Sequence, residues 1–568
     1  MKNSFKKFLR LALAIASLVS CEQDDPVVPP SDKPQPGTYL LPLIETTDMH
    51  GYIVYSESDR AHFRLAYLAN KVKDIRGRKE QYKKEHLLLL DGGDIYQGAS
   101  ISNLLSGQPL YTAMDLMGYD AVAVGNHEFD WDFEDMVDPD ATMPDYEWNG
   151  IKYQNKVPVV CANLYRDGSR SSRTRDYVIV EKSAVNAQGK EVPVKIGIVG
   201  FAPNYASSIM TSKFTGKGYT IEENYSIAND IAAELEASGQ CDATILLTHG
   251  AADYAAGELG RSSVIDLVLG GHSHSTMSGR TGGKPFLQGG RYCEHYAYAD
   301  LKFTVNREGN VSFTSIENQD ILSVNAALDV ETDRLDGDIL AVSQKALWDI
   351  SRELNDVIGH INVGATTYYI NGERATTMSN WMCDILRRIG EADVSFVNSG
   401  GVRTTIPLNG QAARDITVAN VYEMFPFSNT TYVYSITYAD LLRLLKYALT
   451  SGGGSLFSFM TGIDCYYTAQ DTVYSLKKDG TVIYQNGKWT GDWASRTLIL
   501  AVSEYLATSQ REDYTTGQKN PLPEWNETQK LLYDSLIDNE NAVRVLREEA
   551  AQSGGLLFID TAPHFILH

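Results

Sequence analysis

Short apolar runs that each stop at a cluster of histidine, aspartate or asparagine recur along the first half of this chain. Unbroken runs of this length are typical of β-strands that are buried on both faces of a sheet. Five of them cover residues 40–44, 87–90, 121–124, 243–247 and 265–269. Stretches with helical character, such as 63–75 and 225–235, lie between the runs. The pattern predicts a layered α/β domain in which strands and helices alternate.

Each predicted strand leads directly into candidate functional side chains. Open α/β sheets bind ligands at the carboxyl ends of their strands. A lone histidine after a strand is ordinarily a loop or core residue, but five of the eleven histidines fall at these strand ends. We therefore predict one site that contains the following side chains: Asp48, His50, Asp94, Asn126, His127, Asp130, His249, His272 and His274.

The residue types at these strand ends suit divalent metal ions. Histidine, aspartate and asparagine without cysteine favour ions such as Zn, Mn or Fe. Seven of these side chains, all but His127 and Asp130, are candidate ligands. Seven are too many for one four-coordinate ion, but they fit two ions that share a carboxylate and lie roughly 3.5–4 Å apart. Such a pair activates water and holds a phosphoryl group. His127 has a carboxylate nearby in Asp130, so it can stay protonated and assist the leaving oxygen; the alternative is a structural role.

Composition and charge exclude other classes of function. The chain has 568 residues, of which 43% are hydrophobic, so most of it is expected to fold. Its 50 basic and 72 acidic residues give a net charge of −22. Nucleic-acid polymers need a basic surface, so we expect no such partner, whereas a small anion can be held by a few local cations. The sequence leaves the oligomeric state open.

The N-terminus has the features of a bacterial export signal. A basic start precedes an apolar run over 11–19, which is about half the roughly 20 residues that span a bilayer. The run ends in Leu-Val-Ser-Cys21, which looks like a lipobox; the alternative is an ordinary cleaved signal. We predict a signal peptide over 1–20, lipidation of Cys21 and a stiff proline-rich tether over 21–38. Acidic residues directly after Cys21 resemble a surface-display tag, which favours the outer membrane and leaves surface exposure open.

A second region begins near residue 326. Apolar residues spaced three and four apart over 347–358 are typical of one helix face. This helix either bridges two domains or is the first helix of the second one. We predict a first domain over 39–325, a linker helix region over 326–358 and a smaller mixed α/β domain over 359–568. The glycine-rich stretch 451–455 predicts a flexible loop.

The strand-end motifs resemble those of the dinuclear, calcineurin-like metallophosphatases. The series Asp48-x-His50, Gly93-Asp94, Gly125-Asn126-His127-Glu128, His249 and Gly271-His272-x-His274 is in that family's order, and TTDMHG and GNHEFD are similar to its 5′-nucleotidase branch. The resemblance implies a four-layer α/β/β/α metallophosphatase domain followed by a nucleotide-binding domain. One metal would be held by Asp48, His50, Asp94 and His274, and the other by Asp94, Asn126, His249 and His272. Asp94 would bridge them, and His127 and Asp130 would form the catalytic dyad.

The second half of the chain extends this resemblance. Asn398-Ser399-Gly400-Gly401-Val402-Arg403 follows a predicted strand over 394–397 and is similar to the NxGGxR substrate loop of that branch. The branch also has a late NGGDGF-like loop that supplies a second base-stacking ring, but the corresponding segment, 505–514, has no glycine. Tyr514, Tyr505 or neither supplies that ring. The implied substrate residues are Arg374, Asn398, Gly400, Gly401, Arg403, Phe427, Asn429 and Tyr514.

The resemblance implies a defined reaction. We expect metal-dependent hydrolysis of nucleoside 5′-monophosphates to nucleoside and phosphate, in an exported protein that reaches the membrane only through its lipid anchor and serves nucleotide scavenging. Two alternatives on the same metals are a 2′,3′-cyclic phosphodiesterase and a nucleotide-sugar pyrophosphatase. An alternative of another class is a surface binding protein that has lost catalysis, although such a protein has no need of the complete ligand set.

Overall fold

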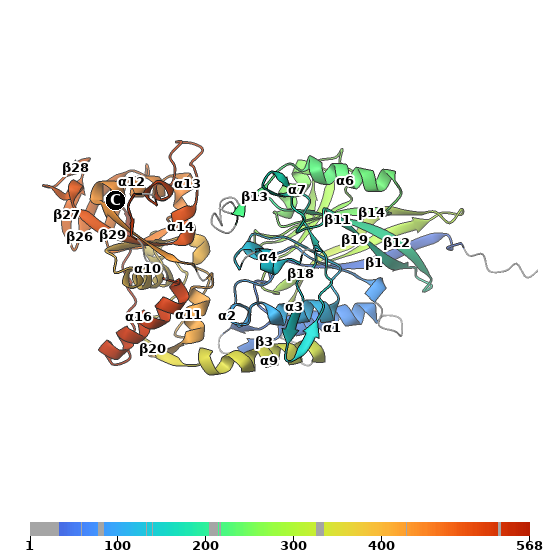
Figure 1. The fold of residues 1–568 in the computed structure, drawn as a ribbon, viewed down its shortest axis with the longest axis horizontal. Helices are drawn as coiled ribbons and strands as arrows, with labels where there is room; N and C mark the ends of the chain where they lie inside the picture. Colours follow the sequence, from blue (N-terminus) through green and yellow to red (C-terminus); the bar gives the residue numbers. More distant parts are fainter. Residues whose placement is uncertain are drawn as a thin grey trace, which may run out of the picture.

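The chain forms two lobes that are joined along one edge by the long helix α9 (Gly337–Leu354) (Figure 1). This computed structural model describes residues 33–568 except 58–59, 78–83, 132, 139, 204–213, 215–216, 325–333, 428, 527 and 532–535. The predicted signal peptide, Cys21 and most of the tether therefore lie outside the described residues, as does the predicted domain boundary at 325–326. Helix α9 packs on α1 (Arg64–Arg76) and α3 (Gln108–Met117) of the first lobe and contacts α11 (Val418–Met424) of the second, so it bridges the lobes.

One large sheet organises the N-terminal lobe. Its main path is β16-β17-β15-β14-β12-β11-β1-β4-β5-β8, and β18 and β19 extend it from β1. The strands around the predicted site form two parallel sets, β1-β4-β5 and β12-β14-β15, which brings the carboxyl ends within each set to the same edge. The strand bounds are β1 Gly37–Thr46, β4 Leu88–Asp91, β5 Ala121–Ala123, β8 Val159–Val160, β11 Tyr177–Val185, β12 Glu191–Phe201, β14 Ala243–Thr248, β15 Leu267–Leu269, β16 Thr276–Thr281, β17 Lys284–Gly289, β18 His295–Val305 and β19 Val311–Ser323.

Three apolar cores show that this sheet is folded into layers. The central core contains strand residues from both parallel sets. One outer core packs α1 and α3 against the sheet, and the other packs α6 (Ser226–Ala237) and α7 (Ala252–Leu259) against its opposite part. Neighbouring strand residues alternate between cores, as Leu43 lies in the central core and Ile44 in an outer one. The four-layer α/β/β/α arrangement is therefore observed.

The predicted elements are present with shifted ends, but the helix face predicted over 347–358 is wrong at its end, because α9 stops at Leu354 and Ile358 lies in the strand β20 (Val357–Ile361). All five predicted strands occur, although 265–269 is reduced to the three residues of β15. The helical stretches 63–75 and 225–235 correspond to α1 and α6. The strand that was predicted before the substrate loop is β21 (Val394–Val397). Apolar periodicity is a local property of the chain, which is why it places these elements well.

The C-terminal lobe is a mixed α/β domain with two five-stranded sheets. Their orders are β24-β21-β29-β23-β30 and β28-β27-β26-β25-β31. Helix α10 (Thr377–Ile389) packs on β21, and α12 (Tyr438–Ala448) packs between the two sheets. The strand bounds are β23 Thr431–Thr437, β24 Phe459–Thr461, β25 Asp464–Tyr467, β26 Val473–Lys478, β27 Thr481–Gln485, β28 Lys488–Trp489, β29 Thr497–Ser503, β30 Lys530–Leu531 and β31 Phe565–Leu567.

The glycine-rich stretch 451–455 is not a flexible loop, and that prediction is wrong. Residues Ser451–Gly454 form the short helix α13, whose N-cap Thr450 accepts a hydrogen bond from Gly453 N. Gly453 is buried, and a Cβ there would lie 1.9 Å from Tyr447 O, so glycine permits close packing on α12. Composition alone does not reveal such a contact with a neighbouring helix.

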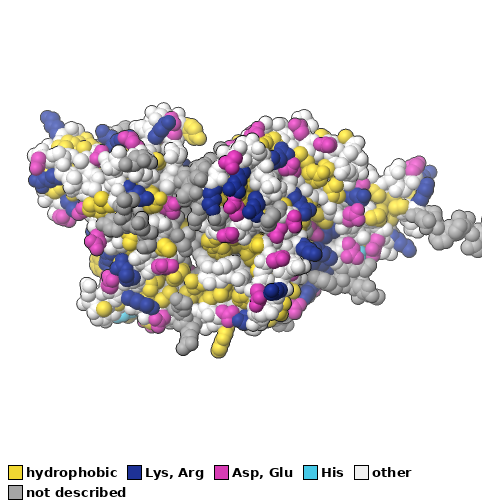
Figure 2. All heavy atoms as spheres, in the orientation of Figure 1, with side chains coloured by type: hydrophobic (Ala, Val, Ile, Leu, Met, Phe, Trp, Pro, Cys, Tyr) yellow, Lys and Arg dark blue, Asp and Glu magenta, His cyan; other side chains and the backbone are white. Residues whose placement is uncertain are grey.

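Charge of both signs is spread over the face of the molecule that Figure 2 shows. Acidic and basic side chains are interspersed on the face that Figure 2 shows, so the net charge of −22 is not gathered there. Within the described part of the chain, no helix combines the length and the apolar character that crossing a bilayer requires.

Candidate metal and substrate site

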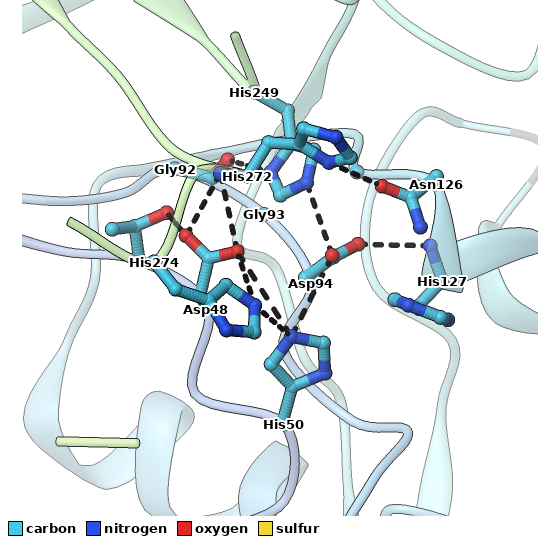
Figure 3. Close-up of polar contacts among 12 residues, drawn as sticks. Asp48, His50, Gly92, Gly93, Asp94, Asn126, His127, His249, His272 and His274 are labelled. Carbon is cyan, nitrogen blue, oxygen red and sulfur yellow. Dashed lines mark hydrogen bonds and ion pairs between the residues drawn. The ribbon is translucent and has the colours of Figure 1, made fainter. Parts of the chain in front are cut away.

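The candidate metal ligands come from the carboxyl ends of both parallel strand sets. Asp48 and His50 follow β1, Asp94 follows β4, and Asn126 follows β5. From the other set, His249 follows β14, and His272 and His274 follow β15. Figure 3 shows these seven side chains pointing toward one another. The structure thus brings together residues that are up to 226 positions apart, in clusters that could hold a metal ion.

The first cluster consists of Asp48, His50 and His274. His274 Nε2 lies 3.4 Å from Asp48 Oδ1, and the Nε2 atoms of His50 and His274 face each other at 3.0 Å. Two imidazole nitrogens that converge in this way suit coordination of one cation. The Nδ1 of His50 lies 2.9 Å from Gln97 O, which as a donor contact leaves Nε2 as the metal ligand.

The second cluster consists of Asp94, His249 and His272. His249 Nε2 lies 3.0 Å from Asp94 Oδ2, yet this buried atom has no aligned hydrogen-bond partner among the described residues. Its Nδ1 lies 2.8 Å from Gly92 O, which again leaves Nε2 as the ligand. Asn126 Oδ1 reaches the same place, 2.8 Å from His272 Nδ1. A divalent cation would satisfy all of these atoms, so the donor set fits a metal.

Asp94 connects the two clusters. Its Oδ2 is also 3.7 Å from His50 Nε2, so a single carboxylate faces ligands of both clusters. Glu128 holds the backbone beneath it by accepting hydrogen bonds from the N–H groups of Asp94, Ile95 and Gly125, at 2.9, 2.9 and 2.7 Å. Asp94 itself has φ of 57°, a left-handed conformation that side-chain residues seldom adopt and that often marks functional sites.

The electrostatics of the site favour a charged Asp94 carboxylate and a protonated His249, with neutral imidazoles at His50 and His272. Burial acts to raise the pKa of Asp94, but His249 and His127 hold it well below its usual range. Burial lowers the pKa of His50, and it lowers that of His272 to about 4. Burial also opposes the charged form of His249, but Asp94 outweighs it and raises this pKa to about 10. A cation at this place would supply the positive charge that Asp94 otherwise draws from a proton.

His127 and Asp130 form a hydrogen-bonded pair at the edge of the ligand set. His127 Nδ1 lies 2.7 Å from Asp130 Oδ2, and its backbone N–H donates to Asp94 Oδ1 at 2.8 Å. Burial acts to lower the pKa of His127, but Asp130 and Asp94 outweigh it and raise the pKa. The buried imidazole is therefore oriented and biased toward its protonated form.

A cleft of about 670 Å³ lies between the two lobes, and Asp94, His127 and Asp130 are among the residues that line it. Five of the predicted substrate residues line it: Asn398, Gly400, Arg403, Phe427 and Asn429. Gly401 completes the same turn as Gly400. The Phe427 ring stacks on the His127 ring, with centroids 5.2 Å apart and planes at 15°, and the Arg403 guanidinium lies 4.6 Å from the Phe427 centroid. The substrate loop of one lobe thus meets the candidate dyad of the other.

Two predicted substrate residues are not brought to this cleft. The Arg374 guanidinium donates to the carbonyls of Ala448, Gly454 and Phe457, at 3.1, 3.2 and 3.0 Å, and it packs 4.6 Å from the Phe565 ring centroid. Tyr514 is fully exposed and is not among the residues that line the cleft. Cys21 lies outside the described residues.

Several residues of the site were not singled out from sequence. Glu128 supports the Asp94 turn, and only its place in the GNHEFD motif pointed to it. Tyr292 lines the cleft, with its ring centroid 5.7 Å from that of His50 and 5.5 Å from that of His274. Arg511 also lines the cleft, together with Tyr505, which the sequence analysis named as a candidate for the second base-stacking ring. No sequence signal marked Tyr292 or Arg511, because their roles depend on which loops the fold brings to the cleft.

Comparisons with known proteins agree with this architecture. The sequence profile of the calcineurin-like phosphoesterases matches residues 41–276, and that of the 5′-nucleotidase C-terminal domain matches 357–491. A 5′-nucleotidase of Vibrio cholerae is 25% identical over 484 residues, which cover 77% of this chain and 80% of that protein. The trifunctional nucleotide phosphoesterase protein YfkN of Bacillus subtilis is 24% identical over 472 residues, but the match spans only 30% of its length.

Solved structures show the same fold. The crystal structure of a 5′-nucleotidase precursor from Thermus thermophilus superposes with a TM-score of 0.66 at 18% identity, and the match covers 93% of this chain and 99% of that one. The sulfate thiohydrolase SoxB of the same genus superposes with a TM-score of 0.61 at 16% identity. Proteins with different named reactions therefore share this fold. The fold alone does not specify the reaction, which depends on the residues of the site.

Proposed function

We propose, from the premise that this chain belongs to the 5′-nucleotidase branch of the calcineurin-like metallophosphatase family, that it hydrolyses nucleoside 5′-monophosphates to nucleoside and phosphate at a pair of divalent metal ions. The chain is accordingly a phosphoric monoester hydrolase. We further propose that it acts as an exported, lipid-anchored enzyme of a bacterial envelope in nucleotide scavenging. The observation that carries the proposal is the Asp94 carboxylate, which faces two ligand clusters directly below a cleft with an arginine.

The residues of the chain have distinct tasks in this reaction. Asp48, His50, Asp94 and His274 would hold one ion, and Asp94, Asn126, His249 and His272 the other. When bound, the ions supply positive charge for the phosphoryl oxygens and lower the pKa of water. Zn, Mn and Fe all suit these ligands.

The dyad and the cleft arginine act on the substrate itself. His127, oriented by Asp130, holds a proton at the cleft wall, where it can bond a phosphoryl oxygen or the leaving oxygen. Arg403 offers its planar donors to the phosphate from the other lobe. Cations on the cleft wall concentrate positive charge in a protein that is otherwise acidic, which favours an anionic substrate.

Phosphate release tests the reaction directly. We expect wild type to release phosphate from AMP and to lose this activity in EDTA. Asp94→Asn removes the shared charge, so it should lower both bound metal and kcat/KM, the latter by about 100-fold or more. Asp471→Asn is the matched control, because it makes the same chemical change at a residue that also has a left-handed φ, 54° against 57°. AMP turnover by Asp94→Asn at the wild-type rate would contradict the proposal.

A panel of substrates separates the competing activities. UDP-glucose tests the nucleotide-sugar pyrophosphatase, 2′,3′-cyclic AMP tests the cyclic phosphodiesterase, and p-nitrophenyl phosphate tests an unselective phosphatase. Preference for AMP supports the 5′-nucleotidase. Metal binding without turnover of any of these esters would leave only the ligand-binding protein.

Lipidation is tested separately from catalysis. Cells that express the full chain should incorporate labelled palmitate into wild type, and Cys21→Ser should abolish the label. Export without label in wild type would instead indicate an ordinary cleaved signal peptide.

A further inference from the structure

The loop between β17 and β18 has a strained backbone beside the first ligand cluster. Tyr292 and Cys293 both have φ of 53°, a left-handed conformation that residues other than glycine seldom adopt, and they adopt it in succession. Both residues are buried. Strained backbone of this kind persists only where the surrounding structure fixes it, and it is frequent at functional sites.

Two hydrogen bonds hold this turn against the metal-binding loops. The N–H of Tyr292 donates to Asp48 O at 2.8 Å, so the turn is tied to the backbone of a candidate ligand. Arg64 Nη1 donates to Tyr292 O at 3.1 Å, and Arg64 Nη2 lies 3.5 Å from Glu294 Oε1. Arginine is almost never fully buried unless it is paired, yet Arg64 is 0% exposed. A buried charge at the start of α1 therefore helps to hold Tyr292 in place.

The held turn places the Tyr292 ring on both imidazoles of the first cluster. Its centroid lies 5.7 Å from that of His50 and 5.5 Å from that of His274, with interplanar angles of 68° and 70°. The two imidazoles are themselves 5.0 Å apart at 65°, so the three rings form one edge-to-face group. The Tyr52 ring, 4.3 Å away, and the Arg291 guanidinium, 4.9 Å from the centroid, also pack on Tyr292 and restrict its motion.

His274 depends on such packing more than other candidate ligands do. A metal-binding histidine almost always fixes its ring through a hydrogen bond from the nitrogen that does not bind the metal. His50 and His249 have this contact, with Gln97 O and Gly92 O. The Nε2 of His274 faces the other two members of its cluster, but within the described part of the chain no protein atom is hydrogen-bonded to its Nδ1. The orientation of the His274 ring must therefore come from its neighbours.

We propose that Tyr292 is a positioning residue that fixes the His274 imidazole by ring packing, in place of a hydrogen bond, and so sets the affinity of the first cluster for its metal ion. The inference rests on the proposed function, because it assumes one ion in each cluster. Among the described residues, the Tyr292 ring contacts neither His249 nor His272 of the second cluster. Loss of the ring should therefore weaken the binding of one ion and spare the other.

Calorimetric titration of the chelator-stripped full chain with Mn²⁺ tests this assignment. We expect wild type to bind two ions. Tyr292→Ala should weaken one of them by about 10- to 100-fold, the usual effect of losing the support of a metal ligand, and should leave the other unchanged. Tyr292→Phe keeps the ring and should bind both ions as wild type does. Tyr254→Ala is the matched control, because it makes the same change at an exposed tyrosine of α7 in the same lobe.

Two further variants separate the ring from the backbone strain. Tyr292→Gly removes the ring but suits a left-handed backbone, so it should be at least as stable as Tyr292→Ala and should bind the first ion as weakly. It carries the comparison if Tyr292→Ala fails to fold, as judged by circular dichroism. In a His274→Ala background, Tyr292→Ala should have little further effect on metal affinity, because Tyr292 acts through that imidazole.

The outcomes are distinguishable. Equal weakening of both ions by Tyr292→Ala would overturn the inference and indicate a general structural role. Weak binding by Tyr292→Phe would overturn it in favour of a role for the hydroxyl, and tight binding of two ions by Tyr292→Ala would show that the ring is not needed. Binding of fewer than two ions by wild type would contradict the proposed function and with it the inference. Two bound ions without release of phosphate from AMP would contradict the proposed function alone.

Discussion

At the scale of single residues, the metal site depends on atoms that are not ligands. Glu128 accepts hydrogen bonds from three backbone N–H groups and so holds the left-handed turn at Asp94. Gly125 lies so close to this turn that a Cβ there would be 2.2 Å from Asp94 Oδ1 and 2.5 Å from Asp94 N. The position of the shared carboxylate is therefore set by the absence of a side chain as much as by hydrogen bonds.

Gly125→Ala should displace the Asp94 carboxylate. A shift of about 1 Å in such a group commonly costs about 100-fold in rate, so we expect kcat/KM to fall by that order and bound metal to fall with it. Elemental analysis of the purified protein and phosphate release measure the two effects. Gly337→Ala is the control, because a Cβ at Gly337 meets no atom within 4 Å. Full metal content and activity in Gly125→Ala would show that the turn adapts.

At the scale of elements, two ion pairs of His564, with Asp464 and Asp560, form what we call the ionic clasp. It lies next to β31, the last strand of the chain. His564 Nδ1 lies 2.8 Å from Asp464 Oδ1 on β25, and its Nε2 lies 2.9 Å from Asp560 Oδ2. Burial acts to lower the pKa of His564, but the two carboxylates raise it to about 9. The clasp joins β31 to β25, with which it pairs in parallel.

The clasp makes stability depend on pH. Because the folded pKa of about 9 exceeds the unfolded value of 6.5, the stabilisation is complete below pH 6.5 and is lost as pH rises through 9. It amounts to about 3 kcal/mol. Thermal unfolding should therefore show a lower Tm for His564→Asn than for wild type at pH 6, and a much smaller difference at pH 10. His568→Asn, whose ring stacks on Tyr474, is the control. A Tm difference that is independent of pH would contradict the charged clasp.

At the scale of the whole molecule, one backbone carbonyl of the second lobe accepts two hydrogen bonds from the first lobe. Pro426 O accepts hydrogen bonds from Gln97 Nε2 at 2.7 Å and from Asn103 Nδ2 at 2.5 Å. Both donors belong to the metal-binding lobe, and Pro426 directly precedes Phe427. This contact between the lobes therefore also helps to place the Phe427 ring on His127.

Loss of the Gln97 side chain should loosen this arrangement. One hydrogen bond contributes about 0.5–1.5 kcal/mol, so Gln97→Ala should disfavour the arrangement of the lobes seen in the structure by about 2- to 10-fold. Small-angle scattering should show a larger radius of gyration, and KM for AMP should rise while bound metal stays unchanged. Gln188→Ala, in an exposed turn of the same lobe, is the control. A lower metal content in Gln97→Ala would indicate instead that Gln97 supports His50.

The sequence by itself determined the five strands that lead into the site and the convergence of the candidate metal ligands at their carboxyl ends. Strand periodicity is local, and residues at the carboxyl ends of neighbouring parallel strands share one edge of the sheet. Only the tertiary structure decided which partners a side chain contacts where several partners compete for it. Arg374 is held by carbonyls at 448, 454 and 457, and Tyr514 turns outward because Asp513 anchors its loop. Such choices depend on distant atoms that no local pattern specifies.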